Sequence, residues 1–133
     1  MVPRGGEAEV VHLSPSLIRF SQRSVSGVAE LTEFMRAGSA VGAADVVRLT
    51  DGSLVTLDNT RVLVASQQGW NVTAVVHDAG DTISPSRAQA FLEQYGTRPS
   101  SWGEAVRLRI RNQGALFRNT YPNGSPYIGV GVK

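Results

Sequence analysis

An Asp-Gly pair between two β-rich runs is the feature that most constrains how this chain folds. Asp51-Gly52 lies between residues 45–49 (DVVRL) and residues 54–57 (LVTL). A pair of this kind between β-rich runs is typical of a tight hairpin turn. The sequence therefore predicts an antiparallel pair of strands in the middle of the chain.

Local patterns predict the elements on either side of this hairpin. Strands are expected in three runs of apolar or alternating residues, at 9–13, 17–20 and 70–76. Helices are expected between start and stop signals at 26–36, 61–68, 84–95 and 101–111. Two of these helices are expected to bury one face, with Val28, Leu31, Phe34 and Met35 in the first and Trp102, Ala105, Val106 and Ile110 in the last. Ser24 or Ser26 is expected to cap the first helix, and Ser100 or Ser101, with Glu104 in capping-box position, to cap the last. Residues 120–133 are expected to form loop and short strand.

The composition indicates one globular domain and excludes cysteine chemistry. The 133 residues are 41% hydrophobic and 18% charged, which is far from the composition of disordered chains. Because there is no cysteine, disulfides, thiolate nucleophiles and cysteine metal sites are excluded. No apolar run is long enough to cross a membrane, and the first 15 residues show no secretory signal. We expect residues 1–8 to be a flexible lead-in or the remnant of a protease site, and residues 9–133 to be a single domain.

Positive charge gathers in the C-terminal third of the chain. Residues 97–133 hold six Lys or Arg and one acidic residue, whereas residues 1–96 hold seven and ten. Twelve of the thirteen basic residues are arginine, whose planar fork suits phosphate. A nucleic acid, a nucleotide or an acidic partner would explain this distribution. The arginine codons of a GC-rich genome would explain the same composition without any function.

The middle of the chain carries the pattern of a known fold. Residues 13–21 (LSPSLIRFS) precede the first helix and the hairpin, and residues 57–65 (LDNTRVLVA) form a polar turn that opens a short helix. Together with Gly69 and the strand that follows it, this order resembles the ParB/sulfiredoxin-like fold over residues 10–78. That family commonly has glycine at the position of Asn59, and a His or a Glu-Arg pair where this chain has Thr60. Sulfiredoxin activity itself is excluded by the absence of cysteine.

The last third of the chain carries a second resemblance. It shows SWGEA at residues 101–105, the spacing from Arg109 through Gln113 to Phe117-Arg118, and YPNGS at residues 121–125. These motifs resemble the C-terminal toxin domains of bacterial polymorphic toxins of the Rhs and haemagglutinin-like kinds. The resemblance implies a domain that is exported within a larger secreted protein and acts in the cytoplasm of a target cell. It also implies a cognate immunity protein, acidic where it covers the arginine-rich face, and we expect a monomer without a membrane span.

The candidate site residues are polar groups at the ends of expected elements. Asp58 and Arg61 flank a helix start, where backbone N–H groups and the helix dipole bind anions, although Asp58 is equally explained as an N-cap. His77-Asp78 follows a strand and is either a general base with its carboxylate or a surface turn. His12 is expected to be a core or edge residue. The candidate substrate-binding residues are Arg19, Ser21, Gln22, Asn59, Thr60, Arg109, Gln113, Arg118 and Tyr121.

These observations lead to one hypothesis and two alternatives. The expected fold is α+β, a small mixed β-sheet with packed helices, with a ParB/sulfiredoxin-like core over residues 10–78 and a helical and loop extension over 79–133. The leading hypothesis is a toxin of the nuclease type, a hydrolase of phosphodiester bonds in DNA or RNA. In it Arg61, Arg109 and Arg118 bind phosphate, and His77 with Asp78, or Asp58, handles protons or a divalent metal.

Both alternatives keep the same fold. One is a nucleotide-dependent transferase toxin, kinase-like or ADP-ribosylating, that uses the turn at residues 58–61 as a phosphate cradle. The other is a non-catalytic DNA-binding module of ParB type, for which no helix-turn-helix pattern is evident after residue 80. The candidate cofactors are accordingly a divalent metal ion or a nucleotide.

Overall fold

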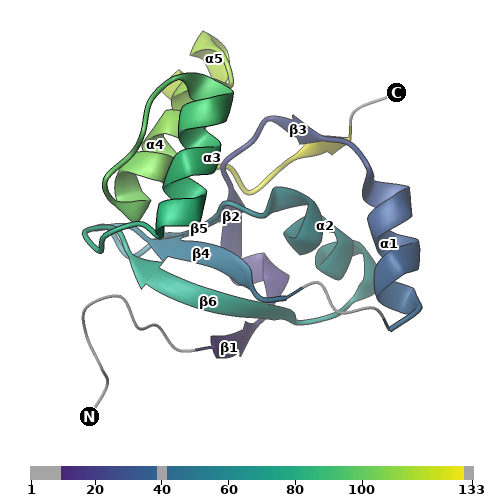
Figure 1. Ribbon diagram of the computed structural model, residues 1–133. Coiled ribbons are helices and arrows are strands. Elements are labelled where there is room, and N and C mark those ends of the chain that lie inside the picture. The colour runs from purple at the N-terminus through teal and green to yellow at the C-terminus, as the bar shows by residue number, and fades with distance from the viewer. Residues whose placement is uncertain (1–9, 39–41, 131–133) are drawn as a thin grey trace.

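The hairpin predicted from Asp51-Gly52 lies within a five-stranded mixed sheet. In the computed structural model, which describes residues 10–38 and 42–130, β4 (Ala44–Arg48) pairs antiparallel with β5 (Leu54–Thr56) (Figure 1). At the turn, the Leu49 N–H donates to the Ser53 carbonyl at 2.8 Å, and Gly52 adopts a φ of 89°. That positive φ is the conformation for which glycine is favoured, so the turn residues explain the hairpin.

Parallel and antiparallel pairs alternate across the sheet. Its strand order is β1 (Val10–Leu13), β6 (Val72–Asp78), β4, β5 and β2 (Ile18–Phe20). The β1–β6 pair is antiparallel, whereas β6–β4 and β5–β2 are parallel. A separate parallel pair joins β3 (Ser24–Val25) to β7 (Gly129–Val130). With helices packed against the sheet, the fold class is α+β, as the sequence predicted.

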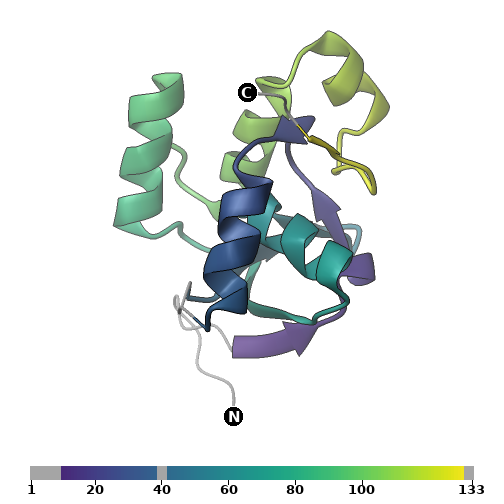
Figure 2. The same ribbon diagram turned by 90° about the vertical axis from the view of Figure 1, so that its right-hand side faces the viewer.

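Two groups of helices cover the sheet. Val46 of β4 belongs to an apolar cluster with Val62 and Ala65 of α2 (Asn59–Gln68), and its neighbour Val47 belongs to a second cluster. That second cluster includes residues of α3 (Pro85–Tyr95), α4 (Trp102–Arg111) and α5 (Ala115–Thr120). Because neighbouring side chains of a strand point to opposite faces, the two helix groups lie on opposite faces at this point of the sheet. α1 (Val28–Arg36) lies beside α2 (Figure 2).

The helices with complete start signals form where the sequence predicted them. At the start of α4 the Glu104 N–H donates to Ser101 Oγ, and Glu104 Oε1 accepts from the Ser100 N–H. Ser101 is therefore the N-cap, while Glu104 reaches back to the residue before the cap and not to the N–H of the cap itself. α3 begins at Pro85 after its cap Ser84. The residues expected to form the buried face of α4 are all buried, namely Trp102, Ala105, Val106 and Ile110.

Other expectations were wrong in detail. α1 begins after Gly27, which has a φ of 75°, and not at Ser24 or Ser26. Phe34 is 49% exposed, whereas Val28, Leu31 and Met35 are half-buried and Thr32 is the buried residue of that helix. α5 was not expected, and β6 continues through His77 and Asp78, which therefore lie within the strand.

Three further expectations concern the chain ends and surfaces. His12 is exposed on the edge strand β1, within hydrogen-bond distance of Thr73. The proposed lead-in at residues 1–8 lies outside the described residues. Within residues 10–38 and 42–130, no helix is long and apolar enough to cross a membrane.

Candidate functional site

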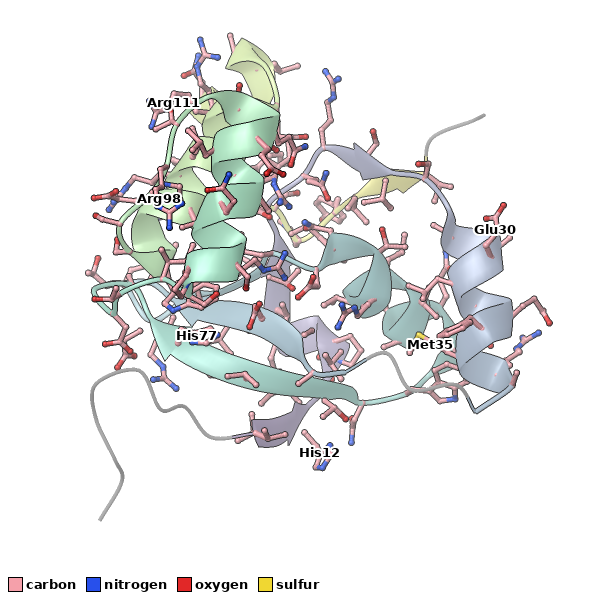
Figure 3. The ribbon with its side chains drawn as sticks, viewed as in Figure 1. His12, Glu30, Met35, His77, Arg98 and Arg111 are labelled. Carbon is pink, nitrogen blue, oxygen red and sulfur yellow. The ribbon has the colours of Figure 1, made fainter. Side chains whose placement is uncertain are left out.

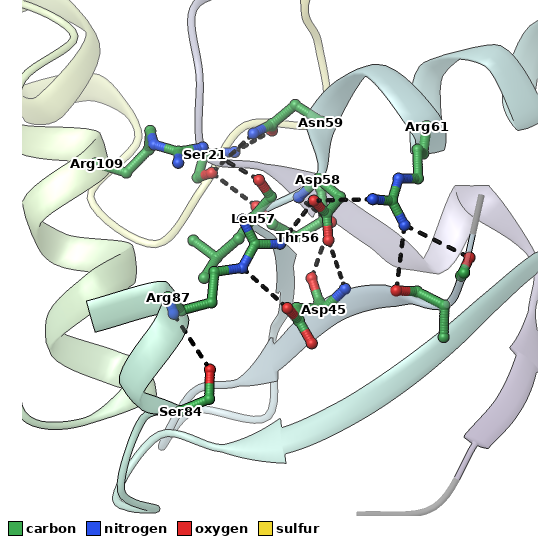
Figure 4. Close-up of polar contacts among 12 residues, drawn as sticks. Ser21, Asp45, Thr56, Leu57, Asp58, Asn59, Arg61, Ser84, Arg87 and Arg109 are labelled. Atoms are coloured by element: carbon green, nitrogen blue, oxygen red, sulfur yellow. Dashed lines mark hydrogen bonds and ion pairs between the residues drawn. The ribbon is translucent and has the colours of Figure 1, made fainter. Parts of the chain in front are cut away.

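Asp45, near the start of β4, is the centre of a cluster of charged side chains. Its Oδ1 lies 2.9 Å from Nε2 of His77, and its Oδ2 lies 3.0 Å from Nε of Arg87. Arg87 also reaches Oδ1 of Asp58 through Nη2 at 2.6 Å, so that one guanidinium bridges two carboxylates (Figure 4). We call Asp45, Asp58, His77 and Arg87 the charged centre.

His77 is fixed on two sides. Its ring stacks on Trp102 of α4, with centroids 3.7 Å apart and planes inclined by 11°, and the residue is 8% exposed. When a neutral His77 donates from Nε2 to Asp45, Nδ1 is left as its acceptor. Figure 3 shows His77 near the base of α3 and α4 and the other histidine, His12, far from it on β1.

The carboxylate partner of His77 differs from the one that the sequence suggested. His77 and Asp78 are neighbours on β6, so their side chains point to opposite faces of the sheet. Asp78 forms an ion pair with Arg48 at 3.0 Å, whereas Asp45 binds His77 from the next strand. A histidine–carboxylate pair is therefore present, but Asp45 and not Asp78 completes it.

The surroundings of Asp45 keep its carboxylate charged. Burial by itself would raise the pKa of Asp45, but the hydrogen bonds from His77 and Arg87 and the positive charge of Arg87 outweigh it and lower that pKa. Burial likewise acts to lower the pKa of Arg87, but the charges of Asp58 and Asp45 raise it. Both shifts favour the charged forms of Asp45 and Arg87, so their contact is an ion pair.

At the start of α2, Asp58 binds the neighbouring strand and not the helix. Its side chain makes no hydrogen bond to the first turn of α2, so it does not act as the N-cap that was the alternative explanation. Its Oδ2 accepts from the Asp45 N–H at 2.7 Å. Arg61 Nη2 lies 3.9 Å from Asp58 Oδ1, and Arg61 Nη1 donates to the carbonyls of Gly42 and Ala43. The Asp58 and Arg61 side chains therefore hold the beginning of β4 against α2.

Ser21 and Asn59 form a buried hydrogen-bonded pair. Asn59 is 2% exposed, and its Oδ1 accepts from the Ser21 N–H at 2.8 Å. Ser21 Oγ donates to the Thr56 carbonyl at 2.6 Å. These two predicted substrate-binding residues thus join the end of β2 to α2. Gln22 and Thr60, predicted beside them, are half-buried.

Arg109 brings an additional positive charge close to the charged centre. It is 7% exposed, its Nη1 donates to the Leu57 carbonyl at 3.1 Å, and its guanidinium lies 4.9 Å from the centroid of the Phe91 ring. Its Nε has no hydrogen-bond partner among the described residues. Burial lowers the pKa of Arg109.

The arginines near the start of α2 outnumber the carboxylates. Arg61, Arg87 and Arg109 gather around Asp45 and Asp58. These three arginines and two aspartates carry a net charge of about +1 when all five are ionised, and a neutral His77 adds nothing to it. An excess of partly buried positive charge favours the approach of an anion.

The predicted row along the C-terminal helices is divided by the structure. Gln113 and Tyr121 line a groove of about 760 Å³ between α5 and the C-terminal segment. Arg118 is exposed on α5, where its Nη1 donates to the Arg111 carbonyl, and it is not among the groove's lining residues. Arg19, on β2, lines two adjoining hollows. Within the described chain, no group of three or more His, Asp or Glu residues is arranged to hold a metal ion.

Sequence reasoning missed Asp45, Arg87 and Trp102. Asp45 begins an apolar strand, and nothing local marks it as a partner of a histidine 32 residues later. Arg87 did carry a signal, because an arginine in the first turn of a helix faces the positive end of the helix dipole. Such a placement indicates that carboxylates lie nearby. Trp102 was assigned correctly to the core, but its contact with His77 depends on how α4 packs.

Comparisons with known proteins do not assign a family. No family model and no curated protein sequence matches the chain. Among solved structures, protein Atu1540 from Agrobacterium tumefaciens is 15% identical with a TM-score of 0.45. That match covers 72% of this chain and 57% of the other, so this chain spans just over half the length of that protein. Neither a family nor a function follows at this similarity.

Proposed function

We propose that this chain is a nuclease effector domain of the polymorphic-toxin kind, which hydrolyses phosphodiester bonds in the nucleic acid of a target cell. The observation that carries the proposal is the contact between His77 and Asp45 beside an excess of arginine. Phosphodiester hydrolysis needs a group that transfers protons and a positive environment for the phosphate. The charged centre and Arg109 offer both within one region.

His77 is the group that transfers the proton in this proposal. Asp45 orients its ring through Nε2 and stabilises the imidazolium, and Trp102 holds the ring plane. This is the relation between base and orienting carboxylate that recurs in hydrolases. Arg61, Arg87 and Arg109 supply the positive field in which a phosphate binds.

A cleavage assay on defined substrates tests the proposal. The purified protein is incubated with 5′-labelled single-stranded RNA, single-stranded DNA and duplex DNA, with and without EDTA, and the products are separated by size. We expect cleavage of at least one substrate. His77→Gln should lower its rate by about 10² to 10⁴-fold, the usual contribution of a general acid or base.

The second histidine provides the matched control. His12 is exposed on β1, so His12→Gln removes an imidazole of the same chemistry away from the charged centre. We expect His12→Gln to cleave at the wild-type rate and both variants to keep the wild-type circular dichroism spectrum. Equal rates in wild type and His77→Gln would contradict the role of His77. Intact substrates in all reactions would contradict the nuclease, and binding without cleavage would favour the DNA-binding alternative.

A further inference from the structure

We infer that the groove beside α5 and the two hollows next to it form one continuous track that binds single-stranded nucleic acid through its bases. This inference rests on the proposed function for its biological meaning, because it names the substrate class as single-stranded. The track itself does not include the proposed catalytic group, since it lies along the β2 edge and the C-terminal segment, whereas His77 is on β6.

The three hollows share their walls. The groove of about 760 Å³ and a hollow of about 300 Å³ are both lined by Thr120 and Tyr121. The second hollow and a third, of about 590 Å³, are both lined by Arg19 and Pro126. Adjoining hollows with shared walls offer an extended binding surface, as a chain of several nucleotides requires.

The charges along the track fit a polyanion. Arg23 lines the groove and Arg19 lines the other two hollows, and none of the described residues lining the three hollows is acidic. Asp51 precedes Gly52 and Ser53, which line the third hollow, and its carboxylate accepts from the Ser53 N–H and from Asn123 and interacts with the charge of Arg19. Phosphates can therefore follow Arg19 and Arg23 without meeting an uncompensated carboxylate among these lining residues.

The apolar part of the groove fits bases. Tyr127 is 72% exposed, and Tyr121 is half-buried with its ring 5.5 Å from Phe117. Flat aromatic side chains next to arginines are the surfaces on which the bases of single strands stack. A duplex hides these base faces in its own stack, and an acidic peptide has none. Single-stranded nucleic acid is therefore the polyanion that uses both the charge and the rings.

Hydrogen bonds of the backbone, one of them to a side chain, hold the walls of the groove in place before any ligand binds. The Arg23 N–H donates to Gln113 Oε1 at 2.8 Å, and the Arg23 carbonyl accepts from the Gly129 N–H at 3.0 Å. Phe20 and Ser125 exchange two backbone hydrogen bonds, of 2.7 and 2.9 Å. A preformed site loses less conformational entropy on binding than a mobile one.

The track is connected to the charged centre through α4. Gln113 Nε2 donates to the Arg109 carbonyl, and the Arg109 guanidinium donates to the carbonyl of Leu57, which precedes Asp58. One helix end therefore contacts both the wall of the groove and the arginine beside the charged centre. A single-stranded nucleic acid bound in the track would therefore lie on a different surface of the protein from His77, the proposed proton-transfer group.

The test is equilibrium binding in EDTA, followed by fluorescence anisotropy, with His77→Gln as the common background of all proteins compared so that no probe is cleaved. The probes are a labelled 12-nucleotide single strand, the same strand as a duplex, and an abasic strand of equal length. We expect the single strand to bind at least about tenfold more tightly than the abasic strand. Tyr127→Ala and Arg23→Gln should each weaken binding of the single strand by about tenfold. Arg23→Gln should also reduce the salt dependence.

Matched controls separate the track from general attraction. Phe34→Ala and Arg36→Gln remove an exposed ring and an exposed arginine from α1, and both should bind like wild type. Equal affinity for the abasic strand, tighter binding of the duplex, or displacement by poly-glutamate at matched charge would overturn the inference. This assay measures binding and not cleavage. If the protein binds the single strand in the track but cleaves no substrate, only the proposed function is contradicted.

Discussion

Asn59, predicted to bind substrate, has a side chain that stabilises the fold at the start of α2. Both its amide atoms contact Ser21, whose hydroxyl donates in turn to Thr56. A sequence shows that Asn59 opens a helix, but it cannot show that Ser21, 38 residues earlier, is its partner. The same limit applies to His77, whose partner Asp45 is on another strand. Residue types in the site could be predicted, whereas their pairing depended on the tertiary fold.

Replacement of Asn59 by alanine should destabilise the protein. It leaves the buried Ser21 N–H without an acceptor, which costs about 1–3 kcal/mol in the free energy of unfolding. Urea denaturation followed by circular dichroism measures this difference. Thr60→Ala, at the half-buried neighbouring position, is the control and should stay within about 0.5 kcal/mol of wild type. A smaller loss for Asn59→Ala than for Thr60→Ala would contradict the structural role.

The lowered pKa of Asp45 predicts how the free energy of unfolding depends on pH. Its pKa is lowered in the folded protein, where His77, Arg87 and Asp58 surround it. Its contribution to stability is therefore complete above the unfolded pKa of about 3.9 and is lost as the pH falls through the folded pKa. Asp45→Asn should be less stable than wild type at pH 7, and this difference should shrink below about pH 4. Urea midpoints at pH 7, 5 and 3 measure it, and a constant difference would disprove the assignment.

Among the helices and turns, the sequence signals predicted those elements that are stabilised by interactions between residues close in the chain. The turn at Asp51-Gly52 and the N-caps at Ser84 and Ser101 each act within a few residues, and the elements beside them formed as predicted. α5 follows Gly114 without a side-chain cap, so it carried no comparable signal. The parallel pairing of β2 with β5 likewise depends on how distant segments pack.

The start of α4 depends on close contact with the end of β6. A Cβ added to Gly103 would lie 2.9 Å from both the Cβ and the carbonyl oxygen of Ala79. Gly103→Ala should therefore lower stability by about 1–3 kcal/mol, because the backbone must shift and the gain in helix propensity is only about 1 kcal/mol. Gly80→Ala is the matched control, since its Cβ would meet nothing within 4 Å. Thermal unfolding compares the two, and equal midpoints would show that the contact is unimportant.

The molecule as a whole is built around β4. This strand has hydrogen-bonded neighbours on both sides, and its side chains enter both apolar clusters. The α+β class could be predicted because strands and helices were recognisable one by one. The strand order could not, because β1 and β2 lie at opposite edges of the sheet although they are close in sequence.

Native-state hydrogen exchange should reflect this central position. We expect the amides of Val46 and Val47 to exchange most slowly, since they open only when the whole sheet unfolds. Amides of the two-residue strands β3 and β7 should exchange much faster. Exchange resolved by NMR measures both groups. Faster exchange in β4 than in β3 would contradict the arrangement.

The pairing of β3 with β7 also affects the order in which the protein can be completed during translation. Residues 20–25 are made early, but their partners at 125–130 are made more than a hundred residues later. On the ribosome, all five strands of the larger sheet are synthesised before Tyr127 and Ile128, which line the groove. The two-stranded sheet of β3 and β7 is therefore completed only after the strands of the five-stranded sheet have all been synthesised.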